Sequence, residues 1–305
     1  MLSAPEPAAS SSDEPHERET VRSILERAQR RLSDPEQLSE GPLVEARELL
    51  AFALSVLPMH LDARLEARPA PDERRRFEEL LRRRLANEPT GYLVGAVELR
   101  GLRFKVDRRA FIPRLDLPVL VDAALEGVPV GLQGHAADLA CGMGAAGILI
   151  GVARPGLAID LADVDQHAVE LARENAERII PGRAHAFVGD LFDCLPADRR
   201  GTYDLIAANP PWVPDGTVLP SEVIDHEPTV SFFGGPDGLN IVRRLIAGLP
   251  AWLKPGGRYG QECDPTQIEK VKALLAETGF IDVRAHKDLE GVYRVVSATR
   301  PGPKR

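Results

Sequence analysis

The sequence is poor in cysteine, in aromatic residues and in long apolar runs. Its three cysteines, Cys141, Cys194 and Cys263, have a spacing that fits neither a zinc site nor a disulfide framework. No apolar run approaches the roughly 20 residues that cross a bilayer, and no basic, apolar leader segment is visible. These absences predict a protein of a reducing compartment, and we expect it in the cytoplasm, without a membrane partner.

The chain also has fewer basic residues than acidic residues. The chain has 38 Lys and Arg residues against 46 Asp and Glu residues, which gives a formal net charge of −8. Proteins that hold a nucleic-acid backbone usually show the opposite balance, so direct nucleic-acid binding is not expected. The histidines are scattered and include no His-x-x-x-His pair, so the sequence offers no metal site.

The chain is long enough for two domains, and its pattern changes along its length. Residues 1–18 are too polar to order and predict a disordered tail. Residues 19–88 predict a small helical bundle used for recognition, since they hold no catalytic constellation. Residues 89–115 predict a linker that contains a short hairpin over Val97–Val106. Residues 116–300 then predict an α/β catalytic domain.

Three segments of the helical region carry apolar residues at three- and four-residue spacing, which is typical of amphipathic helices. The predicted inward positions are Val21, Ile24, Leu25, Ala28 and Leu32, then Leu43, Ala46, Leu49, Leu50, Ala53 and Leu54, then Phe77, Leu80, Leu81 and Leu85. The third segment also carries the runs Arg74–Arg76 and Arg82–Arg84, interleaved with glutamates. We interpret both runs as a solvated face rather than an RNA site.

Two polar residues follow the predicted hairpin. Arg114, in Phe111-Ile112-Pro113-Arg114, is either a surface cation or a partner for a ligand carboxylate. Asp116 is expected to cap a helix that takes Pro118 in its first turn.

A glycine-rich loop follows the short buried strand 136–140. It reads Cys141-Gly142-Met143-Gly144-Ala145-Ala146-Gly147 and leads into a helix whose free N–H groups suit a nucleotide-type ligand. Gly142 and Gly144 allow a tight turn and a close approach of the backbone to the ligand. The next strand ends at Asp163, whose carboxylate can accept hydrogen bonds from two ribose hydroxyls.

The fourth strand of this region ends in an unusual tetrapeptide, Asn209-Pro210-Pro211-Trp212. The two prolines have no N–H, so the local backbone offers carbonyl acceptors and few donors. The Asn209 side-chain oxygen and the Trp212 ring complete a rigid acceptor cluster with an aromatic wall. Such a cluster suits an –NH₂ group. A proline-stiffened turn with a packed tryptophan is the structural alternative.

The spacing Gly142-x-Gly144-x-x-Gly147 also fits a dinucleotide-binding fingerprint, so an NAD-dependent oxidoreductase stays a competing interpretation. Two short strands near the end, Ile281–Ala285 and Tyr293–Ala298, lie too close in sequence for a parallel crossover. An antiparallel pair closing a mostly parallel sheet is typical of the seven-stranded methyltransferase variant of this architecture.

The chain resembles class I S-adenosylmethionine-dependent methyltransferases, and among them the HemK/PrmC family of protein-glutamine N5-methyltransferases. That family modifies the Gly-Gly-Gln glutamine of peptide-chain release factors. The resemblance rests on colinear motifs: Glu88-Pro89, Gly101-Leu102-x-Phe104, Ile112-Pro113-Arg114, the glycine loop, Asp163, Gly189-Asp190-Leu191-Phe192, Asn209-Pro210-Pro211-Trp212, Asp225-His226-Glu227-Pro228, Gly234-Gly235-Pro236-Asp237-Gly238-Leu239, Leu253-Lys254-Pro255-Gly256-Gly257 and Lys287-Asp288-Leu289. It implies a seven-stranded Rossmann-like sheet, a small N-terminal helical bundle and a bridging β-hairpin.

The resemblance also implies roles for individual residues. Asn209, Pro210, Pro211 and Trp212 would receive the substrate amide and carry catalysis. The residues implied to bind S-adenosylmethionine are Asp138, Ala140, Cys141, Gly142, Met143, Gly144, Asp163, Asp190, Leu191 and Asn209. The cofactor's methionine part would lie against residues 140–144, its ribose at Asp163 and its adenine at Asp190 and Leu191.

Several positions depart from the family pattern. Trp212 replaces the usual tyrosine, residues 140–143 replace the commoner Gly-Thr-Gly-Ser, residues 115–118 replace Pro-Glu-Thr-Glu, and residues 262–264 read Glu-Cys-Asp rather than Glu-Ile-Gly. A paralogue that methylates a glutamine of another protein, such as a ribosomal protein, therefore stays open. So do a nucleic-acid amino methyltransferase and a non-enzymatic binding module.

Overall fold

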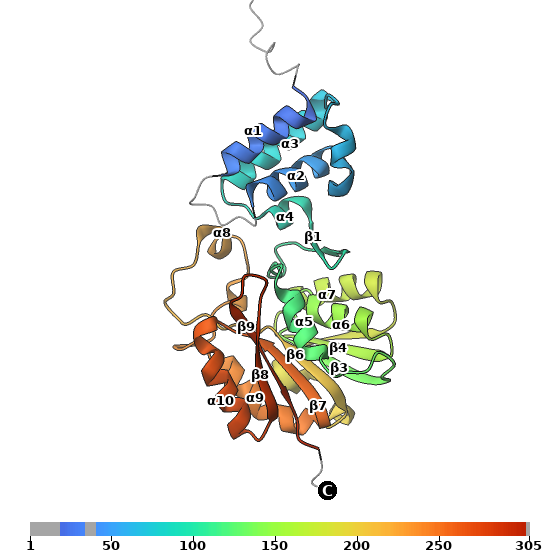
Figure 1. Cartoon of the computed structure of the whole chain (residues 1–305), viewed down its shortest axis with the longest axis vertical. Coiled ribbons are helices and arrows are strands. Elements are labelled where there is room, and N and C mark those ends of the chain that lie inside the picture. Colours follow the sequence, from blue (N-terminus) through green and yellow to red (C-terminus); the bar gives the residue numbers. More distant parts are fainter. Residues whose placement is uncertain (1–18, 34–40, 303–305) are drawn as a thin grey trace, which may run out of the picture. The chain divides into compact units, whose positions relative to one another are not determined.

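The computed structural model describes residues 19–33 and 41–302 of the chain (Figure 1). The predicted tail, residues 1–18, lies outside the described residues. By its internal contacts the chain divides into two compact units, Met1–Val94 and Gly95–Arg305. No helix in the described residues is long and apolar enough to cross a membrane.

The first unit is a small helical bundle. Its elements are α1 (Val21–Leu32), α2 (Pro42–Ala53), the 3₁₀ helix η2 (Pro58–Arg64), α3 (Pro71–Leu85) and α4 (Thr90–Val94). The five inward positions predicted for α1 are all buried, which confirms the predicted face of that helix. In α3, Phe77 and Leu81 have no exposed surface. Together these side chains form one apolar core, which holds the bundle together.

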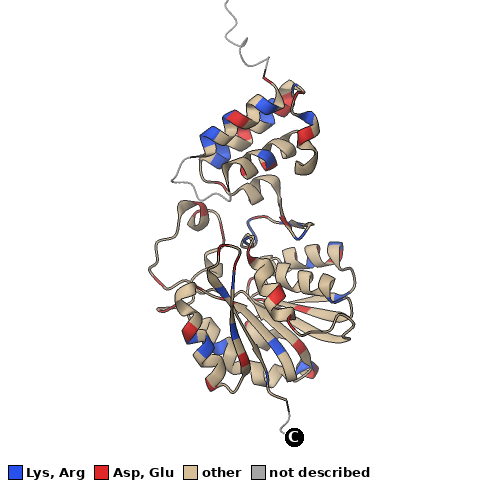
Figure 2. Cartoon of the chain, in the orientation of Figure 1, with Lys and Arg blue, Asp and Glu red and all other residues tan. Residues whose placement is uncertain are grey.

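The prediction of a solvated arginine face is wrong for Arg84. Acidic and basic residues are interspersed along the helices of this unit (Figure 2), but the Arg84 side chain is fully buried. Its Nε and Nη2 donate hydrogen bonds to the two oxygens of Glu45 at 2.8 and 3.2 Å. A buried guanidinium needs such a carboxylate, because without it the lost hydration would not be offset. The ion pair therefore joins α3 to α2.

The second unit is built on a seven-stranded sheet with the order β5-β4-β3-β6-β7-β9-β8. The strands are β3 (Gly134–Leu139), β4 (Leu157–Asp163), β5 (Ala184–Val188), β6 (Tyr203–Ala208), β7 (Leu253–Glu262), β8 (Ile281–Lys287) and β9 (Tyr293–Thr299). The neighbouring strands β5, β4, β3, β6 and β7 pair in parallel. Strand β9 pairs antiparallel with both β7 and β8. The predicted α/β fold with an antiparallel closing pair is confirmed.

Helices cover both faces of the sheet (Figure 1). They are α5 (Leu117–Leu125), α6 (Ala145–Ala153) and α7 (Gln166–Ile179) on one face and α9 (Asn240–Trp252) and α10 (Ile268–Glu277) on the other. Asp116 precedes α5 as expected, but its side chain makes no capping hydrogen bond, so that part of the prediction is wrong.

The predicted hairpin is present as β1 (Ala96–Leu99) and β2 (Leu102–Lys105), an antiparallel pair in the second unit. The shorter elements are η3 (Leu191–Cys194), η4 (Ala197–Arg199), α8 (Ser221–Ile224), η5 (Thr229–Ser231) and η6 (Pro265–Gln267). The boundary at Val94 divides the segment 89–115 between the two units.

The parallel register brings four strand ends to one edge of the sheet. Leu139 of β3 pairs with Ala162 of β4 and Ala208 of β6, and Ala208 pairs with Gln261 of β7. The loops that follow these strands are therefore neighbours, as expected for a ligand site in an open α/β sheet.

Candidate functional site

The glycine-rich loop after β3 turns through three residues with left-handed backbone. These are Ala140 (φ 56°), Gly142 (φ 53°) and Gly144 (φ 82°). A Cβ at Gly142 would meet no atom within 4 Å, so this part of the loop faces open space. At Gly144 a Cβ would lie 3.1 Å from Leu161 Cδ1, so this glycine is packed against the sheet side. The loop thus presents bare backbone at Gly142, and Gly144 is the N-cap residue of α6.

Asp163, at the end of β4, contacts the glycine-rich loop through its carboxylate. Its Oδ2 accepts a hydrogen bond from the Gly142 N–H at 2.8 Å, and its Oδ1 accepts one from the Asp165 N–H at 3.0 Å. Burial raises the pKa of this carboxyl, and the two backbone donors oppose the rise. Each oxygen keeps a further lone pair, so the carboxylate can accept additional hydrogen bonds from a ligand.

Asp138, in β3, hydrogen-bonds to the first turn of the helix that follows the glycine-rich loop. Its carboxyl is buried in β3, and Oδ2 accepts a hydrogen bond from the Gly147 N–H at 2.7 Å. A Cβ at Gly147 would lie 2.5 Å from Leu161 Cδ2, so only glycine allows α6 to approach the sheet this closely. Burial raises the pKa of Asp138 to about 7.

Cys141 and Met143 are buried within the loop, and Asn175 of α7, which sequence reasoning missed, contacts it. The Asn175 Nδ2 donates to the Met143 carbonyl at 3.2 Å and to the Lys105 carbonyl at 2.9 Å. Its Oδ1 accepts from the Lys105 N–H at 2.8 Å. Asn175 therefore fixes the loop to the end of β2. Its helical position gave no signal for this contact.

Asp190 and Leu191 follow β5. Asp190 is exposed, and its Oδ2 accepts a hydrogen bond from Arg244 Nη2 of α9 at 2.7 Å. Leu191 is half-buried and has left-handed backbone, with φ 53°. These two residues stand at the end of the strand next to β4, so they border the side of the site opposite to β6.

The acceptor motif Asn209-Pro210-Pro211-Trp212 follows β6 directly. Asn209 is half-buried, and its side chain makes no hydrogen bond with any described residue. The Pro210 carbonyl likewise accepts none from the part of the chain that the structure describes. Trp212 packs against the buried cluster of Val213, Val223 and Phe232. Among the described residues, the Asn209 side chain and the Pro210 carbonyl therefore leave acceptors unused at the sheet edge.

A second glycine-rich turn, residues 234–238, lies against this motif. A Cβ at Gly234 would come within 2.5 Å of the Pro211 carbonyl oxygen, and one at Gly238 within 2.1 Å of the Trp212 carbonyl oxygen. The Val213 N–H donates to the Phe232 carbonyl at 2.8 Å, and the Gly234 N–H donates to the Val213 carbonyl at 2.9 Å. The glycines thus allow the chain to return directly beside the acceptor motif.

Glu262 ends β7 and follows Gln261, which pairs with Ala208 at the end of β6. It is 6% exposed, and burial raises the pKa of its carboxyl to about 8, helped by the neighbouring Asp116 carboxylate. The positive charges of Arg114 and Arg294 oppose this rise. In the sequence, Glu262 is distinguished only as part of the Glu-Cys-Asp motif that departs from the family pattern.

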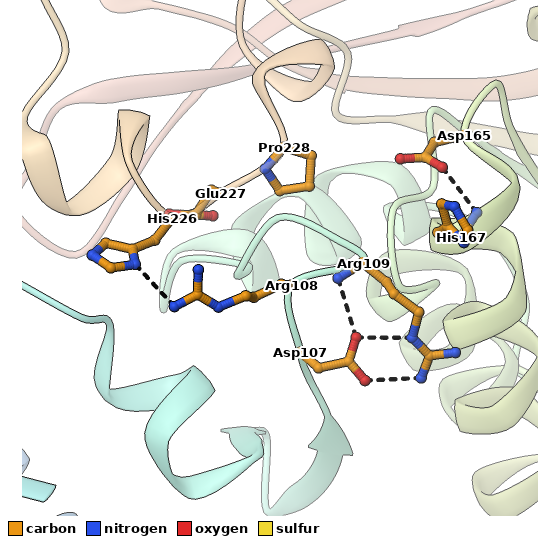
Figure 3. Close-up of a pocket in the computed structure, with 8 residues that line it drawn as sticks. All are labelled: Asp107, Arg108, Arg109, Asp165, His167, His226, Glu227 and Pro228. Atoms are coloured by element: carbon orange, nitrogen blue, oxygen red, sulfur yellow. Dashed lines mark hydrogen bonds and ion pairs between the residues drawn. The ribbon is translucent and has the colours of Figure 1, made fainter. Parts of the chain in front are cut away.

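An open pocket of about 680 Å³ adjoins the site near the start of α7. Figure 3 shows the lining residues, which are Asp107, Arg108, Arg109, Asp165, His167, His226, Glu227 and Pro228. Across it, Arg108 Nη2 lies 3.2 Å from His226 Nδ1, and the Glu227 Oε2 accepts from the Ile112 N–H at 2.9 Å. Burial raises the pKa of Glu227 to about 7. Asp165 connects this pocket to Asp163 through the hydrogen bond described above.

Two family models match the chain. Residues 120–225 match the model described as "Methyltransferase small domain", and residues 23–95 match the model described as "PrmC N-terminal domain". The first match includes the glycine loop, Asp163 and the acceptor motif.

Proteins of known function are similar over most of the chain. A "Release factor glutamine methyltransferase" of Geobacter sulfurreducens is 34% identical over 91% of this chain and 95% of its own length. The protein of that name from Neisseria gonorrhoeae is also 34% identical, over 85% of this chain and 93% of its own length. A "Ribosomal protein uL3 glutamine methyltransferase" of Bordetella pertussis is 38% identical over 72% of this chain and 74% of its own length.

The fold matches solved structures as well. A methyltransferase from Pyrococcus furiosus superimposes with a TM-score of 0.51 at 18% identity, covering 73% of this chain and 99% of that one. This likeness concerns the fold alone. Taken with the family models and the relatives, it leads to one conclusion: the chain belongs to the HemK/PrmC family of glutamine methyltransferases, enzymes that use S-adenosylmethionine.

Proposed function

We propose that this protein transfers a methyl group from S-adenosylmethionine to the side-chain nitrogen of the Gly-Gly-Gln glutamine of peptide-chain release factors. The observation that carries the proposal is the pair of unused acceptors at the end of β6, the Asn209 side-chain oxygen and the Pro210 carbonyl. A primary amide has two N–H donors and a flat π face, and this site offers two acceptors and an aromatic ring. Since release factors act in the cytoplasm, the proposal includes that location.

The residues at the ends of β3 and β4 fit the cofactor. Open space at Gly142 accommodates a ligand against the backbone, and Asp163 keeps lone pairs for ribose hydroxyls while it holds the loop. Ala140, Cys141, Met143 and Gly144 shape the same loop. Asp138 acts on the cofactor through the loop, because its carboxyl is directed at the Gly147 N–H.

The adenine side of the proposed cofactor site is formed by Asp190 and Leu191. Asp190 is already paired with Arg244, so the adenine contacts would come from its remaining lone pairs and from the Leu191 side chain. Removing the Arg244 partner tests whether that ion pair holds Asp190 in place for the ligand.

The acceptor motif would act by orienting the substrate amide. When bound, S-adenosylmethionine would supply a methyl group made electrophilic by its sulfonium charge; its C–S bond would break as the C–N bond forms, and the methylated nitrogen would lose one proton to water. An amide nitrogen is a weak nucleophile because its lone pair is delocalised into the carbonyl. Asn209 and the Pro210 carbonyl would each accept one N–H, turn the lone pair toward the methyl group and stabilise the positive charge that grows on nitrogen. Trp212 would lie along the amide plane and favour that charge through its π face.

The test is peptide mass spectrometry on a purified bacterial release factor incubated with this protein and S-adenosylmethionine. One added methyl group on the Gly-Gly-Gln glutamine is the expected result. A release factor with that glutamine replaced by glutamate is the matched control and should gain none. If the native peptide gains no methyl group while the cofactor still binds, release factors are not the substrate.

Ribosomal protein uL3 is the second candidate substrate. The relative named for it is 38% identical to this chain, a higher identity than the release-factor relatives reported above, although over a shorter stretch. The same reaction with purified uL3 separates the two, since methylation of uL3 and not of the release factor would replace the first proposal with the second. A methylated RNA or DNA would reject both.

A further inference from the structure

Gln267 lies 55 residues from the acceptor motif in sequence but contacts it directly. It ends η6, the turn that follows β7, and its side chain is 3% exposed. Since β7 is the strand beside β6, η6 and the acceptor motif leave the same edge of the sheet next to one another.

Both ends of the Gln267 amide are used. Its Nε2 donates hydrogen bonds to the Trp212 carbonyl at 2.8 Å and to the Asp237 carbonyl at 3.2 Å. Its Oε1 accepts a hydrogen bond from the Asp264 N–H at 3.2 Å. One buried side chain therefore joins the end of the acceptor motif, the glycine turn 234–238 and the start of η6.

The acceptor motif needs such an external support. Pro210 and Pro211 have no N–H with which to hold their own backbone. The carbonyl of Trp212 is therefore a point where the segment can be fixed, and Gly238 leaves room for nothing larger than hydrogen beside it. Moving that carbonyl would move the Trp212 ring and the Pro210 carbonyl with it, because the prolines make the segment rigid.

We infer that Gln267 is a positioning residue for methyl transfer: it fixes the Trp212 carbonyl and thereby sets the orientation of the substrate amide. This inference rests on the proposed function. It assigns Gln267 no contact with the substrate or the cofactor. The loss of its donors should lower the rate of transfer without weakening cofactor binding, because the glycine loop and Asp163 do not contact it.

Two variants test the hydrogen-bond donors of Gln267 while keeping a side chain of similar volume. Gln267→Met keeps the volume and removes both donors, and Gln267→Glu keeps the Oε1 acceptor and removes the donors at neutral pH. We expect kcat to fall by about 10- to 100-fold in both, since a misplacement of about 1 Å has an effect of that size. The dissociation constant of S-adenosylmethionine should stay within about threefold.

The pH dependence distinguishes positioning from general destabilisation. A glutamate regains one O–H donor when it is protonated, so the kcat of Gln267→Glu relative to wild type should rise as the pH falls. The same ratio for Gln267→Met should stay flat, because methionine has no group to protonate. Thermal melting of each variant establishes that it is folded. Gln133→Glu is the matched control, since Gln133 is exposed and precedes β3 at the opposite edge of the sheet.

Tryptophan fluorescence gives a readout that does not depend on activity. The chain has two tryptophans, and Trp252 is 4% exposed in the core. A red shift in Gln267→Met but not in Gln133→Glu would report displacement of Trp212. Unchanged kcat with unchanged emission, or a loss of cofactor binding parallel to the loss of kcat, would overturn the inference. If wild type fails to methylate release factors, the proposed function fails, and the fluorescence comparison still decides whether Gln267 positions Trp212.

Discussion

The Asp163 carboxylate accepts a hydrogen bond from the backbone N–H of Gly142 at 2.8 Å, so the side chain that we propose to bind the ribose also shapes the glycine loop. Asp163→Ala removes both functions. We expect cofactor affinity to fall by about 100-fold, since a hydrogen bond to a charged group contributes about 1.5–3 kcal/mol. Isothermal titration calorimetry with S-adenosylmethionine measures this. Asp163→Asn, which keeps one acceptor oxygen, should lose less, and equal losses would contradict the assigned role.

Asn209 is expected to matter for transfer and little for cofactor binding. In Asn209→Ala the amide loses one of its two acceptors, so kcat should fall by at least about 100-fold, the effect of removing one preorganised partner of a developing charge. Cofactor affinity should change by no more than a few-fold. Single-turnover assays beside calorimetry separate the two quantities. A large loss of cofactor binding would make Asn209 mainly a cofactor residue.

Ala140 occupies a left-handed backbone conformation that glycine adopts more easily. Ala140→Gly should relieve this strain and raise the free energy of unfolding by about 0.5–1 kcal/mol, somewhat less than the full cost of left-handed backbone because glycine also gains freedom in the unfolded state. Urea denaturation measures the change. A less stable variant would mean that the alanine methyl group makes contacts that outweigh the strain.

The Arg84–Glu45 pair should be essential to the helical unit. Glu45→Gln removes the carboxylate that pairs with a fully buried guanidinium, and the expected loss is about 3–5 kcal/mol of the free energy of unfolding. Circular dichroism during thermal unfolding reports it. Glu79→Gln is the control, because the Glu79–Arg82 pair on the same helix is exposed and should contribute little. Similar effects of the two substitutions would contradict the buried pair's importance.

Asp138 should make stability depend on pH. Its folded pKa of about 7 lies above the ordinary value of 3.8, so the folded state holds a proton that the unfolded state releases. Its contribution is therefore complete below about pH 4 and is lost as the pH rises through about 7. Asp138→Asn cannot titrate, so the wild-type advantage over this variant should shrink between pH 5 and pH 8. Urea denaturation at both pH values measures the difference, and a constant difference would show that Asp138 does not titrate in this range.

The sequence by itself determined the order of the elements and the main motifs of the site. The inward face of α1 could be predicted because helix periodicity is a local property, and all five of its predicted positions are buried. The short separation of β8 and β9 excluded a parallel crossover, and the two strands pair antiparallel. Gly142 and the prolines at 210 and 211 act through their own backbone chemistry, which needs no knowledge of distant residues.

Only the tertiary structure decided which side chains support those motifs. Arg84 was indistinguishable in sequence from its exposed neighbours, and its burial depends on Glu45, 39 residues away. Asn175 reaches the Met143 carbonyl, and Gln267 reaches the Trp212 carbonyl, across 32 and 55 residues of chain. Such contacts cannot be predicted from local patterns, because they form when strand register and helix packing bring together groups whose desolvation must then be offset by hydrogen bonds.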